Sequence, residues 1–473
     1  MRMILSVLLL FSGVLLNGAE FSKAAVPEIR ARENFFAALQ TADVKEKTEL
    51  LLAALEIEPA SELYFQELNR CEPDRETQIK SGARLLKLVR KHPELFRLAL
   101  LGIHWNNSAG FTPQEYVELL ELILNHIPEN EPAALIFFDQ KLIALRSCGD
   151  FSALKDLVRV RDKKLLVPIA RYAYMANFFE PEKYASAWET VQKNLKASED
   201  NDPEHLFRLE GFYFNLHDYA ATHRLRRMRI PYRNGQVPLQ ELSMELVLLA
   251  GQGKFAEAFK QIAPLKIEHP EAFNRFAQLL NDYKNSKTKK REPVIRVDKL
   301  LPLLENEKPG LRLSAGLQLL IYAEKKRDVE LYRNVRQKLL PDAVEPEVLN
   351  AIGYVGVELN EMVDENRKLI EKALYLSPNQ YAYQDSLAWA MFRQGQFKAA
   401  MDAVRKALYL VPANKDDLDQ LGVIFMHAGD IAMACGDRQE AIKFYRRALS
   451  CVNDRELDHS AVKKKLEKAE ASK

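Results

Sequence analysis

The sequence predicts an all-α protein, an α-solenoid of stacked helical hairpins. Apolar residues recur at spacings of three and four along most of the 473 residues, as expected for amphipathic helices. Nearly the same helix ending occurs twice, LIEKALYLSP and AVRKALYLVP, at a distance of 34 residues. No run of alternating β-branched residues bounded by turn signals is present, so we expect essentially no sheet.

Residues 1–24 have the pattern of a secretory signal peptide. The apolar run Ile4–Leu16 has 13 residues, whereas a bilayer span needs about 20. Small residues follow, and we expect cleavage after Ala24 or Ala19. The chain is therefore predicted to be exported, to the periplasm or beyond, with no transmembrane span in the mature chain. The alternative is an uncleaved membrane anchor.

Composition excludes several classes of partner and cofactor. The chain is 47% hydrophobic and 28% charged with a net charge of +2, so no global field favours nucleic acid. The four cysteines show no metal-ligand spacing, and no metal or other cofactor is expected. Cys435 and Cys451 are predicted to end two antiparallel helices at opposite tips of a hairpin. We therefore expect four unpaired thiols, mostly buried.

Residues 25–284 are predicted to form a divergent array of hairpins that resemble the later repeats. The expected helices are 28–40 and 44–56, 62–69 and 77–91, 94–105 and 113–126, 132–147 and 151–159, 168–178 and 181–196, 205–216 and 219–228, and 239–251 and 254–266. Pro168 and Pro181 are each expected at the start of a helix, where the missing N–H costs nothing.

Residues 285–297 form a basic linker in this interpretation. Lys287, Lys289, Lys290 and Arg291 stand there among polar residues without an apolar neighbour. A solvated linker between two arrays is the simpler interpretation, and a contact for a phosphate head group or an acidic partner is the other. Residues 298–345 then supply one more pair of helices.

Residues 346–453 are predicted to form three similar repeats. In the middle one, Tyr381–Pro412, a first helix Tyr381–Gln394 is followed by a turn at Gly395 and a second helix. Ala400 and Ala407 are expected where the two helices approach closely. The third repeat opens seven residues late, so an extended first helix from position 417 would keep its apolar face in register. Residues 454–473 are expected to be a capping helix and tail.

These three units resemble tetratricopeptide repeats, whose period is 34 residues and whose pattern is W-x2-L-G-x2-Y…A-x3-F…P. The middle unit matches that spacing at Leu387, Ala388, Met391, Ala400, Val404 and Pro412, with Gln384 in place of the first Trp. The segment DSLAWAMFRQGQFKAA resembles a subgroup common in bacterial cell envelopes. The resemblance implies a protein-binding scaffold.

No motif for phosphate-cradling loops, zinc peptidases or nucleophile elbows occurs, so the chain is not expected to be an enzyme. Asp416, Asp417 and Asp419 could suggest a metal or acid–base cluster. Their place at the start of a helix favours capping and dipole stabilisation instead.

A candidate peptide-binding groove is predicted on the first helices of the three repeats. Its residues are Asn350, Tyr354, Asp385, Trp389, Arg393 and Asp430. Aromatic area beside acid, base and amide groups suits a peptide. The alternative is that Trp389 and Tyr354 pack between adjacent repeats. The Lys/Asn/Arg clamp of the family's best-understood groove is not present at matching positions.

The sequence thus predicts an exported, non-catalytic scaffold that binds protein or peptide partners in the bacterial cell envelope. The alternative function is an envelope factor that binds or organises a polysaccharide assembly or export machine. Exposed aromatics without charged neighbours would favour the glycan alternative.

Overall fold

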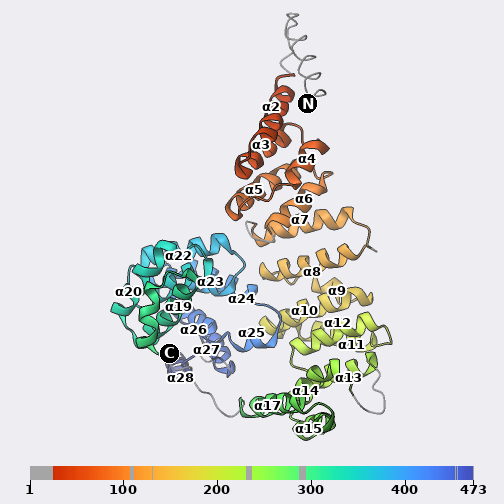
Figure 1. The fold of residues 1–473 in the computed structure, drawn as a ribbon, viewed down its shortest axis with the longest axis vertical. Helices are drawn as coiled ribbons and strands as arrows, with labels where there is room; N and C mark the ends of the chain where they lie inside the picture. The colour runs from red at the N-terminus through yellow and green to blue at the C-terminus, as the bar shows by residue number, and fades with distance from the viewer. Residues whose placement is uncertain are drawn as a thin grey trace, which may run out of the picture. The chain divides into compact units, whose positions relative to one another are not determined.

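In the computed structural model, the described residues are 25–106, 111–129, 131–230, 237–286, 295–452, 454 and 456–471. Every regular element within these ranges is a helix, which confirms the predicted all-α class (Figure 1). The predicted signal peptide lies outside the described residues. The chain divides into two compact units, residues 1–128 and 129–473.

The helices of the first unit were predicted to within a few residues. They are α2 (Ala25–Gln40), α3 (Val44–Ile57), α4 (Glu62–Asn69), α5 (Arg75–Lys91), α6 (Phe96–Asn106) and α7 (Pro113–His126). The closest packing there is between α2 and α3 and between α5 and α6. Helix starts carry side-chain caps: the Asp74 carboxylate accepts the Thr77 N–H at 2.8 Å. Thr112 and Glu115 cap α7 reciprocally.

The second unit begins with a run of paired helices up to residue 286. They are α8 (Pro132–Ser147), α9 (Leu154–Leu157), α10 (Lys163–Phe179), α11 (Pro181–Ala197), α12 (Pro203–Asn215), α13 (Tyr219–Arg229), α14 (Leu242–Gly251), α15 (Phe255–Ile262), α16 (Leu265–Glu268) and α17 (Pro270–Ser286). A 3₁₀ turn precedes α14. Helix α17 was not singled out from the sequence.

The later helices contain the predicted three repeats and the pair before them. They are α18 (Val297–Leu300), α19 (Pro309–Lys326), α20 (Val329–Leu339), α21 (Pro346–Glu358), α22 (Val363–Leu376), α23 (Tyr381–Arg393), α24 (Phe397–Leu410), α25 (Lys415–Asp419), α26 (Gly422–Ala434), α27 (Arg438–Ser450) and α28 (His459–Ala471). Helices α21–α22, α23–α24 and α26–α27 are antiparallel hairpins whose two helices pack along their length.

Small residues allow the two helices of a repeat to approach closely. Ala400 and Ala407 of α24 are fully buried, as the sequence predicted. A Cβ atom at Gly429 of α26 would lie 2.4 Å from the Tyr445 ring of α27, so this crossing requires glycine. Gly395 turns the middle hairpin with φ of 75°, a conformation that L side chains avoid.

Two predicted helices have different bounds in the structure, because side chains form hydrogen bonds with backbone groups at their ends. The segment predicted as helix 151–159 is helical only over Leu154–Leu157, and the Asn194 amide donates to the Val158 carbonyl at 2.9 Å. Helix α10 begins five residues earlier than predicted, because the Asp162 carboxylate caps the Lys164 N–H. Pro168 therefore lies inside α10 rather than at its start.

The extended first helix predicted for the third repeat is wrong. The segment forms two helices, α25 and α26, with an interruption at residues 420–421. The Asn414 side chain caps α25 by accepting the Asp417 N–H at 3.0 Å. The Asp454 carboxylate accepts the Val423 N–H at 3.1 Å, so α26 starts with its own cap. Two caps make a break more favourable than one continuous helix.

Helices on both sides of the predicted basic linker share one hydrophobic core. Phe151 and Phe212 from the earlier helices belong to the same cluster as Val404 and Phe425 from the later ones. The Arg447 guanidinium of α27 lies 4.6 Å from the Phe178 ring centre. Most of the linker, 287–294, lies outside the described residues, and the division there stays a prediction.

The four cysteines are free thiols, with Cys71 and Cys451 buried and Cys435 exposed. Among the helices of the described ranges, none is both long and apolar enough to cross a membrane.

Candidate functional site

The residues predicted for a groove lie on three first helices that follow one another in the array. Asn350 and Tyr354 are on α21, Asp385, Trp389 and Arg393 on α23, and Asp430 on α26. Helix α23 contacts both α21 and α26, so the structure brings the three helices together. It also adds residues that the prediction omitted, of which His427 is central.

His427 is a fully buried histidine that links α26 to α23. Its Nδ1 atom lies 2.9 Å from Oδ2 of Asp385, and its ring stacks 4.1 Å from the Trp389 ring at 16°. Burial lowers the pKa of His427, but the charges of Asp385, Glu358 and Asp430 outweigh it, and the pKa is raised overall. The buried pair therefore favours the imidazolium–carboxylate form.

Trp389 packs between adjacent repeats, as the alternative in the sequence analysis described. Its side chain is only 7% exposed, between His427 of the next repeat and Phe392 at 4.8 Å on its own helix. Leu387 and Met391, which match the repeat pattern of α23, are only partly buried. The neighbouring first helices cover the face that was expected to be open.

Two glutamates, Glu324 of α19 and Glu358 of α21, lie near the His427 cluster and influence its charges. Burial, together with the charges of Glu358 and Glu456, raises the pKa of Glu324 to about 7, although Tyr354 and His427 oppose the rise. Glu358 lies 3.3 Å from Arg327 and 3.9 Å from Arg393. The arginines compensate Glu358, whereas Glu324 has no such partner among the described cations.

Asp430 ties α26 to the end of the array rather than facing a partner. Its carboxylate accepts a hydrogen bond from the Tyr445 hydroxyl at 2.8 Å and pairs with Lys465 of α28. Helix α28 thus closes the last repeat with a polar contact as well as with buried Val462.

Several buried polar atoms of this cluster have no hydrogen-bond partner within the described chain. They are Asn350 Oδ1, Asp385 Oδ1, Trp389 Nε1 and His427 Nε2. The buried Nε2 atom, beneath the Trp389 ring, is not placed to exchange a proton with a substrate in this state. The cluster is suited to fixing the stack of first helices. The described residues contain no group of three or more His, Cys, Asp or Glu arranged for a metal ion.

Asp416, one of the three clustered acids, lies in the first turn of α25 and within 3.1 Å of His217 Nε2. Asp417 is part of the Asn414 cap. These two acids lie in the first turn of α25, as expected for dipole stabilisation, but the capping side chain is Asn414 and not one of them.

The first helices of earlier hairpins expose large apolar side chains that the sequence analysis did not select. Ile136 of α8 is 59% exposed, Phe207 of α12 is 63% exposed, and Met244 of α14 is 37% exposed. The sequence could have indicated them as apolar residues on the polar face of an amphipathic helix. The repeat pattern in these hairpins is too weak to show which face of each helix is the polar one.

Stacked antiparallel hairpins with small residues at their crossings define an α-solenoid repeat protein. Residues 424–450, which span most of α26 and α27, match the tetratricopeptide repeat family. A TPR repeat-containing protein of Pseudomonas aeruginosa is 33% identical over 91 residues, 19% of this chain and 15% of that protein. The chain therefore matches only a small part of that relative. Within this α-solenoid, residues 424–450 are a tetratricopeptide repeat.

Solved structures similar to the chain include the C-terminal part of a TPR repeat-containing protein from Cytophaga hutchinsonii. That match has 16% identity and a TM-score of 0.24, and it covers 62% of this chain and 98% of the other. Yeast Tom70 matches over 94% of this chain and 95% of its own, with 12% identity and a TM-score of 0.26.

Proposed function

We propose that this chain is an exported, non-catalytic scaffold of the bacterial cell envelope that binds a protein or peptide partner through its first helices. The observation that carries the proposal is the exposure of Ile136, Phe207 and Met244 on first helices of the hairpins before the linker. Contiguous exposed apolar area is typical of a protein interface, and we assign these three side chains to such a surface.

Three residues of the predicted groove, Asp385, Trp389 and Asp430, are not free to contact a partner. Asp385 and Trp389 are 5% and 7% exposed, and Asp430 is engaged with Tyr445 and Lys465. Asn350, Tyr354 and Arg393 are partly buried. The proposal therefore moves the contact surface to the apolar side chains of the earlier first helices.

One contact favours a peptide over a glycan as the partner. The Arg229 guanidinium lies 5.2 Å from the centre of the Phe207 ring, so the one aromatic among these three side chains has a charged neighbour. Sugar-binding platforms present a free aromatic face, whereas peptide interfaces combine aromatic and arginine side chains. The polysaccharide alternative has no comparable observation in its favour.

Export rests on the sequence of residues 1–24, with their short apolar run and the small residues that follow. Amino-terminal sequencing of the protein from fractionated cells tests it. A mature chain that starts at Ala25 or Glu20 in an envelope fraction is expected. Intact Met1 in the cytoplasmic fraction would contradict export.

Partner binding is tested by capture from envelope extract with matched variants. Phe207→Ala combined with Met244→Ala removes exposed apolar area from first helices. The control combines Met228→Ala and Phe397→Ala, which are 41% and 38% exposed on second helices. A protein that the parent and the control retain and the first-helix variant loses is the expected result. Equal recovery by all three would contradict the assigned surface.

A further inference from the structure

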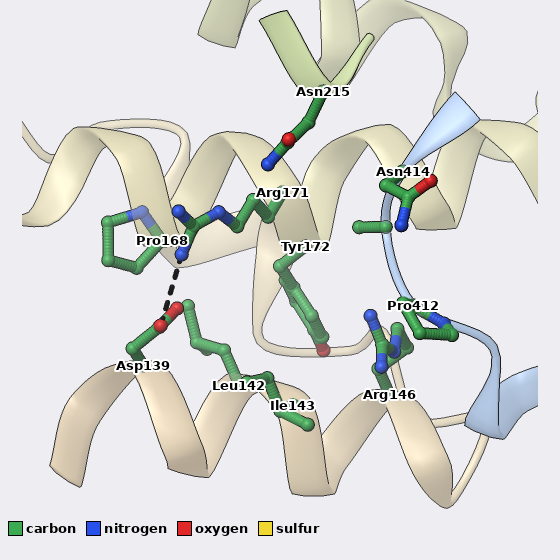
Figure 2. A pocket seen from close by; sticks show the side chains of 11 residues that line it. Asp139, Leu142, Ile143, Arg146, Pro168, Arg171, Tyr172, Asn215, Pro412 and Asn414 are labelled. Atoms are coloured by element: carbon green, nitrogen blue, oxygen red, sulfur yellow. Dashed lines mark hydrogen bonds and ion pairs between the residues drawn. The ribbon is translucent and has the colours of Figure 1, made fainter. Parts of the chain in front are cut away.

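A cavity of about 360 Å³ lies at the junction between early and late helices of the second unit. Its walls come from α8, α10, the end of α12 and the loop 412–414 that leads into α25 (Figure 2). Residues far apart in sequence therefore build it, and His427, Asp385 and Trp389 are not among them. Nothing in the repeat pattern indicated this cavity.

Arg146 contributes a buried positive charge for which the described chain shows no ion pair. Its side chain lines the cavity and is 7% exposed, and its Nε atom has no hydrogen-bond acceptor in the described chain. Burial lowers the pKa of Arg146 to about 10, against the opposing charge of Asp139. Arg226 is buried to the same degree but forms ion pairs with Glu210 and Glu241.

The remaining charges of the cavity cancel each other. Arg171 donates to an Asp139 carboxylate oxygen at 3.1 Å, as Figure 2 shows. The lining thus carries one positive charge in excess, on Arg146. Because an unpaired buried charge is costly, the arrangement favours a ligand with a single negative charge. A planar carboxylate matches the guanidinium fork.

The rest of the lining is suited to an apolar body attached to that carboxylate. The apolar and aromatic side chains of the wall are Leu142, Ile143, Pro168, Tyr172, Pro412 and Ala413. The Tyr172 hydroxyl is already occupied, since it donates to the Asp150 carbonyl at 2.6 Å. The ring therefore offers its apolar surface, and its hydroxyl has no free proton to donate to the carboxylate.

We propose that this cavity binds a monocarboxylate with an apolar body, its carboxylate on Arg146 and its apolar part between α8 and α10. The ligand contacts both α8 and the loop 412–414, so its binding stabilises the junction between early and late helices. A free aliphatic acid and the end of a peptide chain share this chemistry, and the probes below distinguish them.

The test titrates the full chain with 4-methylpentanoate, N-acetyl-leucine and the neutral N-acetyl-leucinamide. Calorimetry and the melting temperature report binding. A ligand of this size is expected to bind with a Kd of about 1 mM. Either acid should bind saturably and raise Tm, and the amide should not. The tighter acid identifies the source as a free acid or a peptide end.

Variants link binding to the cavity. Arg146→Met should abolish binding and leave Tm equal or higher, because it removes an unpaired buried charge. Ala413→Trp keeps both arginines but fills the cavity, and it should also abolish binding. Arg159→Met, at an exposed position on the same unit, is the control and should bind like the parent.

Three results would overturn the proposal. The first is that neither acid binds to the parent at concentrations up to 20-fold above the expected Kd of about 1 mM. The second is unchanged binding to Arg146→Met. The third is inorganic phosphate binding at least as tightly as the acids in a manner that requires Arg146, which would make the cavity a general anion site.

Discussion

Replacing Trp389 with alanine tests how the repeats are held together. The side chain is 7% exposed and lies against the His427 ring at 4.1 Å and the Phe392 ring at 4.8 Å. Truncation of a buried tryptophan commonly costs about 3–5 kcal/mol of folding free energy. We expect a value in this range, because the helices on either side are fixed by their own hairpins and cannot close the cavity.

Urea unfolding followed by circular dichroism measures this cost without relying on tryptophan fluorescence. Phe207→Ala is the matched control, since that ring is 63% exposed and its loss should change stability by less than about 1 kcal/mol. A Trp389→Ala protein that unfolds within about 1 kcal/mol of the parent would refute the packing between repeats. It would restore Trp389 as a candidate for the predicted groove.

Three further changes test other parts of the structure. Glu324→Gln should leave the free energy of unfolding unchanged at pH 4 and raise it at pH 8. The pKa of Glu324 is raised from 4.5 to about 7, so the fold favours the protonated side chain, and the parent loses stability as pH rises from 4.5 to about 7. At 1.36 kcal/mol per pKa unit, the upper bound is about 3 kcal/mol in thermal or urea melts, and equal stability of the parent and Glu324→Gln at pH 8 would contradict the raised pKa. Gly149→Ala should lower Tm more than Gly253→Ala: both have positive φ, but only at Gly149 would the new Cβ lie 2.6 Å from the ring of Tyr409, and equal effects would contradict that contact. Trypsin cleavage in the predicted basic linker should leave two fragments that elute together in size-exclusion chromatography, because both sides contribute to one core; separate elution would contradict the shared core.

The sequence predicted helices well where local signals decide the structure. The bounds of α4, α7 and α8 agree with the predicted ranges, since each has a polar residue or proline at its start and an apolar period of three to four. The 34-residue repetition indicated the hairpins α21–α22 and α23–α24 in the same way. These features depend on neighbours within one or two turns of the chain.

The site depended on contacts that no local pattern contains. The pattern of α23 alone predicts an open face at Trp389, whereas the His427 ring of the next repeat covers it. His427 pairs with Asp385, which lies 42 residues earlier in the sequence. Because the third repeat is offset by seven residues, the 34-residue period does not align these two positions. Arg146 meets the loop at 412–414 only because late helices pack on early ones. Such juxtapositions follow from the stacking of hairpins and not from their sequence.

The most direct test of the scaffold function is the affinity of the captured partner for the parent and for Phe207→Ala. Loss of an interface aromatic typically costs about 2 kcal/mol of binding, so Kd should rise about 30-fold. The Met228→Ala control should leave Kd within about twofold, as expected for a residue outside the interface. A Kd for Phe207→Ala that equals that of the parent would contradict the claim that first-helix apolar residues hold the partner.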